Sequence, residues 1–262
     1  MNASGGADAE RNDCRFQRQA ADFGTAKHKI AMTEKQVLLS TTYFGPVQWY
    51  QKLYRYDRVF IERCDTFRKQ TYRNRCVIAT TNGAQALTVP VERAAGAQQV
   101  RDIRISDHGN WRHIHWHALL SAYSESPFFD YYADDIRPFF ERKWEFLYDY
   151  NMEICQKMCE LLDITPHISP TGQYIHADDL PSPLVEKDGS HSETGGSNCE
   201  TACISGTIAD FRDAIDPKHP LEDRDFAPKN YYQVYAVKHG FMPNLSVLDL
   251  LFNMGTEAIF YL

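Results

Sequence analysis

A turn and the polar residues that follow it are the first candidates for chemistry. Gly45 and Pro46 turn the chain after Tyr43, and Gln48 and Lys52 follow four residues apart. Residues at this spacing share one face of an α-helix, and the N–H groups at a helix N-terminus attract anions. The pattern predicts that Tyr43, Gln48 and Lys52 contact a phosphate or carboxylate. The alternative is a solvated helix face with no ligand.

The second candidate is a basic stretch. Residues 55–75 contain seven Lys and Arg against three Asp and Glu, in a chain with a formal net charge of −7. Arginine presents a planar, permanently charged group that suits phosphate and carboxylate. If the run is extended, Arg73 and Arg75 lie on one face and Gln70 and Asn74 on the other. This predicts an anion-binding wall, and the alternative is an edge strand whose charges prevent aggregation.

The third candidate is a histidine cluster. In a helix, His113 and His117 share one face and His115 lies on the opposite one. Imidazole titrates near neutral pH, so His115 is the candidate general base, and Trp116 is a candidate wall of the site. The alternative is a hydrogen-bonded structural His115. No metal is predicted, because the glutamate of the His-Glu-x-x-His motif is absent.

Cysteines and acidic pairs give weaker signals. Cys155 and Cys159 have the spacing of neighbours on a helix face and are expected to be small core residues. Cys199 and Cys203 repeat that spacing, but structural zinc prefers closer pairs. The Asp-x-Asp pattern at Asp223 is too short to be specific. Neither pattern supports a metal, and no cofactor is indicated.

Strands and helices intermix along the 262 residues, of which 43% are apolar and 24% charged. This composition is that of a globular protein. The patterns predict an α/β fold, with a mixed sheet, helices packed on it and a single compact core. A hairpin turn is expected at Asn82 and Gly83, and a capped helix after Ser246. We expect strands at 37–42, 59–62, 72–79, 85–91, 101–105 and 231–235, and helices at 46–55, 111–124, 134–141, 143–163 and 247–254.

Composition also changes along the chain. Residues 1–35 are expected to form a flexible extension and residues 36–262 one domain. Within that domain, residues 166–230 are rich in Pro, Gly, Ser and Asp, which is typical of a loop-rich, partly ordered segment. No stretch is as long and apolar as a membrane helix or a secretory signal, so a cytoplasmic location is expected.

Several motifs, in this order, resemble the WbqC-like protein family of bacteria. The resemblance covers about 37–165 and 231–262, and residues 166–230 depart from the longer members. The matching stretches are Tyr-Phe-Gly-Pro-Val-Gln (43–48) with Lys52, Gln-Thr-Tyr-Arg-Asn-Arg (70–75), Leu-Thr-Val-Pro-Val (87–91), His-Trp (115–116), Ser-Ala-Tyr (121–123), Ser-Pro-Phe-Phe (126–129), Trp-Glu-Phe-Leu (144–147) and Gly-Phe-Met-Pro-Asn-Leu-Ser-Val-Leu-Asp-Leu-Leu-Phe-Asn (240–253).

The resemblance implies a link to O-antigen and surface-polysaccharide biosynthesis. It suggests a group transferase that moves an acyl or aminoacyl group to an amino sugar, a sugar nucleotide or a similar small anionic metabolite. The alternative is a non-enzymatic nucleotide or nucleic-acid binding module that uses residues 55–75, although the acidic net charge makes nucleic acid the less favoured partner. The transferase hypothesis requires Lys52, Arg73 and His115 to meet in one electropositive hollow.

Overall fold

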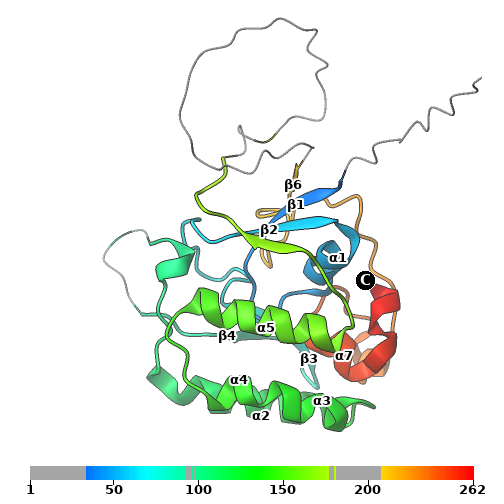
Figure 1. The fold of residues 1–262 in the computed structure, drawn as a ribbon. Helices are drawn as coiled ribbons and strands as arrows, with labels where there is room; N and C mark the ends of the chain where they lie inside the picture. The colour runs from blue at the N-terminus through cyan, green and yellow to red at the C-terminus, as the bar shows by residue number, and fades with distance from the viewer. Residues whose placement is uncertain (1–33, 93–95, 97, 177–179, 181–207) are drawn as a thin grey trace, which may run out of the picture. The chain divides into compact units, whose positions relative to one another are not determined.

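The computed structural model describes residues 34–92, 96, 98–176, 180 and 208–262 (Figure 1). The extension expected at 1–35 lies outside the described residues except for its last two. The segment expected to be loop-rich, 166–230, is described in part.

A four-stranded parallel sheet forms the centre of the described domain. Its strand order is β5-β2-β1-β6. The interior of β1 is a continuous apolar run, Val37 to Leu39, and is fully buried, as expected of a strand covered on both faces. Helix α1 (Val47–Arg55) connects β1 to β2, as the sequence predicted. The strands are β1 (Gln36–Ser40), β2 (Arg58–Glu62), β5 (Ile168–Pro170) and β6 (Ile208–Asp210).

A separate antiparallel hairpin follows β2. Strands β3 (Arg75–Thr80) and β4 (Gly83–Thr88) pair from Arg75 opposite Thr88 to Thr80 opposite Gly83. Gly83 has φ = +97°, a conformation that glycine adopts without a steric penalty. The hairpin predicted at Asn82 and Gly83 is therefore confirmed.

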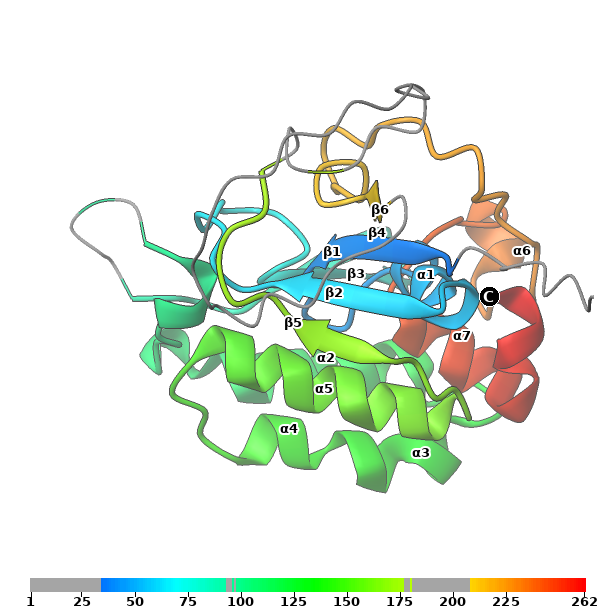
Figure 2. The same cartoon turned by 45° about the horizontal axis from the view of Figure 1, so that its top comes forward.

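Helices pack beside these strands, as two views of the fold show (Figure 1 and Figure 2). Helix α1 begins after Pro46 without a side-chain cap. Helix α7 begins as predicted, since the Ser246 hydroxyl accepts a hydrogen bond from the Leu248 N–H. The helices after α1 are α2 (Trp111–Tyr123), α3 (Phe129–Ile136), α4 (Pro138–Glu141), α5 (Leu147–Leu161), α6 (Ala236–His239) and α7 (Val247–Met254), with 3₁₀ turns η1 (Val100–Asp102), η2 (His108–Asn110) and η4 (Gly255–Tyr261).

Two predicted elements were wrong, and a third differs in its bounds. Residues 101–105 form the end of the 3₁₀ turn η1 and an isolated bridge from Ile105 to Val91, not a strand. Residues 231–235 are irregular, and their alternation arises because Tyr231 and Gln233 both turn inward to the buried Asp249. The helix expected at 134–141 begins earlier, at Phe129, and is divided into α3 and α4 before Pro138, which has no N–H to continue the ladder.

The observed class is α/β, as predicted: a parallel sheet with helices packed on it and a compact core. The sequence did not predict that the loop-rich segment 166–230 supplies both edge strands, β5 and β6. In the part of the chain that the structure describes, no helix has the length and apolarity needed to cross a membrane.

Candidate functional site

The candidate site lies at the carboxyl edge of the parallel sheet. From β1 the chain continues to β2 and β5 on one side of the sheet, and then returns to β6 on the other side of β1. Ligands of open parallel sheets bind beside the carboxyl ends of the strands where the strand order reverses, which here is between β1 and β6. The residues at these ends are Ser40 to Thr42 after β1 and Phe211 to Asp213 after β6.

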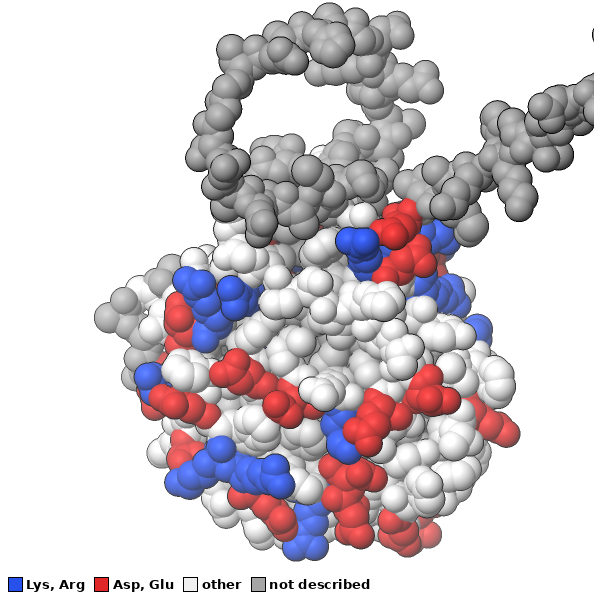
Figure 3. All heavy atoms as spheres, in the orientation of Figure 1, with Lys and Arg blue, Asp and Glu red and all other residues white. Residues whose placement is uncertain are grey.

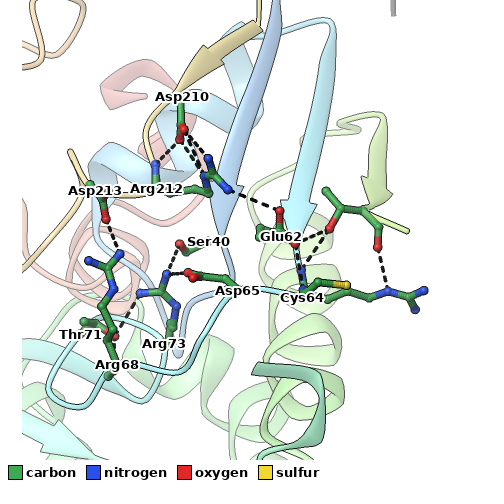
Figure 4. A network of polar contacts seen from close by, with 12 residues as sticks. Ser40, Glu62, Cys64, Asp65, Arg68, Thr71, Arg73, Asp210, Arg212 and Asp213 are labelled. Carbon is green, nitrogen blue, oxygen red and sulfur yellow. Dashed lines mark hydrogen bonds and ion pairs between the residues drawn. The ribbon is translucent and has the colours of Figure 1, made fainter. Parts of the chain in front are cut away.

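A buried arginine occupies this edge (Figure 4). Arg73 is only 3% exposed, forms an ion pair with Asp65 and donates to the Ser40 hydroxyl at 2.7 Å. Burial lowers the pKa of Arg73, and the nearby Asp65 opposes that shift. Arginine nevertheless stays charged in proteins. The edge of the sheet therefore holds a fixed positive charge whose counter-ion comes from the turn after β2.

A second buried arginine joins the ends of β2 and β6 (Figure 4). Arg212 donates to both carboxylate oxygens of Asp210, at 2.6 to 3.1 Å, and lies 3.5 Å from Glu62. Burial opposes the charge of Arg212, but the hydrogen bonds with Asp210 outweigh that effect and raise its pKa. Glu62 also accepts hydrogen bonds from the Thr171 hydroxyl at 2.6 Å and from the Cys64 N–H at 2.8 Å. This carboxylate therefore fixes the relative positions of three strand ends.

A small cavity of about 10 Å³ lies between the two arginines. Its lining includes Thr42, Arg73 and Arg212. Among the described residues, the Arg73 Nε and the Thr42 hydroxyl are buried without a hydrogen-bond partner. A buried donor left unpaired costs about 1–3 kcal/mol, so such a pair indicates a missing acceptor. The cavity has room for about one water molecule or one oxygen atom of a ligand.

The turn before α1 fixes the position of Thr42. A Cβ atom on Gly45 would lie 2.9 Å from the Thr42 Cβ and would overlap its hydroxyl oxygen, so only glycine fits there without displacing Thr42. The N–H groups of Val47 and Gln48 are bonded to the Leu245 carbonyl and the Asn244 side chain. These two groups are therefore not free to bind an anion, contrary to the expectation for this helix N-terminus.

Gln48 and Lys52 lie together, as predicted, but their anionic partner belongs to the chain itself. Lys52 is fully buried and forms a 2.7 Å ion pair with Asp223, to which Gln48 also donates at 2.8 Å. Burial would raise the pKa of Asp223, but these two contacts lower it overall. The Lys52 ammonium also lies 4.3 Å from the centre of the Phe211 ring, which lines the small cavity. Lys52 and Arg73 thus both lie near the segment after β6.

His115 lies in an aromatic part of the core. It is 4% exposed, and its Nδ1 is 2.8 Å from the Tyr43 hydroxyl. The ring centres of Trp111 and Phe140 lie 5.1 and 6.5 Å from that of His115. Burial lowers its pKa from 6.5 to about 4, so the imidazole is neutral at physiological pH. No hydrogen bond or ion pair joins it to Lys52 or Arg73 within the described structure, and the chain link to the cavity is the step from Tyr43 to Thr42.

The remaining predicted residues occupy separate places. Gln70 is exposed and bonded to Lys218, and Asn74 is buried with its amide on the Val89 carbonyl. Arg75 donates to the Thr88 hydroxyl at 3.0 Å, across the β3–β4 hairpin. Trp116 is half-buried and lines a different groove. Of the predicted set, only Arg73 lines the small cavity, so the expected meeting of Lys52, Arg73 and His115 in one hollow is not observed.

Sequence reasoning missed most of the charged groups at the carboxyl edge. The missed charged residues are Glu62, Asp65, Asp210 and Arg212. The uncharged Thr42 was also missed. Glu62 and Thr42 carried a usable signal, because each is the last residue of a segment predicted as a strand. Asp210 and Arg212 carried none, because they end or follow a strand of three residues inside a polar segment.

The metal alternatives gain no support from the described residues. No group of three or more His, Cys, Asp and Glu side chains there is arranged to hold a metal ion. Cys155 and Cys159 are buried free thiols, as expected for core residues. Cys199 and Cys203 lie outside the described residues.

Comparison with known proteins assigns the chain to a family. The profile of the WbqC-like protein family matches residues 41–261, which is most of the chain. The protein therefore belongs to the WbqC-like family. It is 28% identical to the uncharacterized protein Rv1507c of Mycobacterium tuberculosis, over 89% of this chain and 97% of that protein. No solved structure matches the chain significantly.

Proposed function

We propose that the protein is a group transferase whose small anionic substrate binds at the carboxyl edge of the parallel sheet. The observation that carries the proposal is a pair of buried groups, Arg73 Nε and the Thr42 hydroxyl, that have no partner among the described residues and belong to two residues that line the cavity beside β1 and β6. A guanidinium and a hydroxyl on residues that line one small cavity suit an oxygen of a carboxylate or phosphate.

The reaction class follows from the resemblance of the sequence to the WbqC-like family. An acyl or aminoacyl group would pass from an activated ester or thioester to the amino group of an amino sugar. The carbonyl carbon gains a bond to nitrogen and loses its bond to the leaving group, and the proton that the amine gives up ends on that group, which departs as a free alcohol or thiol. This reaction would serve surface-polysaccharide biosynthesis, and the anionic group of the sugar derivative would bind Arg73.

The proton acceptor assigned from the sequence is His115, and that assignment stays a prediction. Its neutral imidazole is the protonation state that a general base requires. Its observed partner is the Tyr43 hydroxyl. His115 would therefore affect catalysis indirectly, by holding Tyr43 and, through the chain, the neighbouring Thr42. On this geometry, His115 would position Thr42 rather than contact the substrate.

The alternative, a nucleic-acid binding module that uses residues 55–75, has less support. Arg58 pairs with Glu34, Arg68 with Asp213 and Arg73 with Asp65, so these cations are already neutralised within the chain. On the face shown in Figure 3, Lys and Arg are interspersed with Asp and Glu instead of forming a continuous basic patch.

The test is a thermal-shift screen of the full chain against nucleotides, sugar nucleotides, amino sugars and acyl thioesters, since a specific ligand raises the melting temperature. We expect a hit whose shift is lost in Arg73→Lys and reduced in Thr42→Val. Arg101→Lys, an exposed arginine outside the cavity, is the matched control. The proposed site is disproved if no hit of the screen is weakened by Arg73→Lys and Thr42→Val.

Turnover is tested by mixing the hit with the acyl thioesters and measuring the amide product by mass spectrometry. If His115 acts through position 42, His115→Gln should lower both the affinity and the rate. If it is the general base, the rate should fall while the affinity is unchanged. If the hit binds but none of the acyl donors yields a product, the protein is a binding module and the transferase proposal is contradicted.

A further inference from the structure

A second hollow lies on another part of the domain, beside α2 and α4. Its volume is about 710 Å³, within the range of sites for small molecules. None of its lining residues lines the small cavity at the carboxyl edge. In Figure 1, α2 and α4 lie below α5, away from β1 and β2. We call this hollow the α2–α4 groove.

One of the charged residues that line the α2–α4 groove carries hydrogen-bond donors without a partner in the described structure. Asp107 pairs with Arg112 at 2.6 Å and with Lys143 at 2.8 Å, and Glu141 pairs with Arg137 at 2.6 Å. Three cations therefore face two acids. Arg112 uses only Nη1 for Asp107, while its Nε and Nη2 are buried without a partner among the described residues. Two free N–H groups on one guanidinium suit two oxygens of an oxyanion.

Aromatic and imidazole side chains form another part of the groove. Trp116 and Phe140 both line it, with ring centres 5.9 Å apart. His113 and His117 lie next to each other on α2, with ring centres 4.1 Å apart. Aromatic and imidazole faces of this kind stack on planar rings such as nucleobases.

We propose that the α2–α4 groove binds a phosphorylated ligand that carries a planar ring, which is the chemistry of a nucleotide. The phosphate contacts Arg112, and the ring stacks on Trp116. This site is independent of the one proposed at the carboxyl edge, because it uses different residues.

The test is isothermal titration calorimetry of the full chain with adenosine 5′-monophosphate and uridine 5′-monophosphate, compared with adenosine and with ribose 5-phosphate. We expect at least one of the two nucleotides to bind with a Kd of about 1 mM or tighter. Adenosine and ribose 5-phosphate should each bind about tenfold more weakly, because each lacks one of the two contacts.

Variants separate the two contacts. Arg112→Gln and Trp116→Leu should each weaken nucleotide binding by about tenfold, whereas Arg104→Gln, an exposed arginine outside the groove, should leave it unchanged. Arg73→Lys should also leave it unchanged, which distinguishes this site from the proposed transferase site. Absence of nucleotide binding, or binding that Arg112→Gln and Trp116→Leu both retain at full strength, would overturn the proposal.

Discussion

Two buried polar regions of this protein differ in how completely their groups are paired. Around His115, the imidazole and the Tyr43 hydroxyl satisfy each other, and aromatic rings surround them. At the carboxyl edge of the sheet, Arg73 and Thr42 each keep a group without a partner in the described structure, although several carboxylates lie nearby. Paired polar groups in an apolar setting stabilise a fold, whereas unpaired polar groups on residues that line one cavity favour a ligand there. The difference favours a structural role for the first region and supports the proposal that a ligand binds at the second.

The largest expected effect comes from removing the central carboxylate of the carboxyl edge. Glu62→Ala leaves the buried Thr171 hydroxyl and Cys64 N–H without their acceptor and removes one of the two carboxylates beside Arg212, so the free energy of unfolding should fall by about 3–5 kcal/mol. Urea denaturation measures this change in the free energy of unfolding. Glu145→Ala, which removes an exposed partner of Arg104, is the control and should change little. A loss from Glu62→Ala no larger than that of the control would mean that the edge is not a fixed scaffold.

The pH dependence of stability tests the His115 region. Its folded-state pKa of about 4 lies below the ordinary value of 6.5, so the unfolded chain takes up the proton first as the pH falls. The stabilising contribution is complete above pH 6.5 and is lost towards pH 4, by about 3 kcal/mol in all. This loss should be present in His113→Gln, an exposed histidine on the same helix, and absent in His115→Gln. Equal pH profiles for both variants would contradict a buried, neutral His115.

Gly45→Ala probes the contact that positions Thr42. The new Cβ would overlap the Thr42 side chain, so we expect a loss of about 1–3 kcal/mol in stability together with weaker ligand binding. Gly172→Ala is the matched control, because a Cβ there meets no described atom within 4 Å. If Gly45→Ala changes stability no more than Gly172→Ala, the turn does not constrain Thr42.

The smallest effect is expected where an ion pair at the same edge is exposed. Arg68 and Asp213 are half or more exposed, so Arg68→Ala should cost no more than about 1 kcal/mol, and less at high salt. Denaturation at low and high salt measures the effect. A loss as large as that of Glu62→Ala would show that burial is not what separates the two ion pairs.

The sequence predicted those elements whose signal is local. Pro46 located the start of α1, hydrophobic periodicity located α5, the Ser246 cap located α7, and the Asn82-Gly83 turn located the hairpin. Strands β5 and β6 were missed, because each has three residues and owes its conformation to pairing with strands far away in the sequence.

The candidate site was predicted less well, for the same reason. Arg73 was recognisable by its charge, but its setting depends on Asp65, Ser40 and the segment after β6. His115 and Lys52 were recognisable by residue type, yet each has a partner, Tyr43 or Asp223, that spacing along the chain does not reveal. Residue type thus identified candidates, whereas pairing decided which of them remain available.

The most direct test of the central claim observes the Arg73 Nε–H itself. Nuclear magnetic resonance of the full chain labelled with ¹⁵N-arginine resolves this group, and Arg73→Lys identifies its signal by loss. The account predicts that phosphate or acetate, added at constant ionic strength, shifts the Arg73 Nε–H signal to saturation, and that His115→Gln preserves a saturable shift. An Arg73 Nε–H signal that neither anion moves would contradict a binding site at the carboxyl edge.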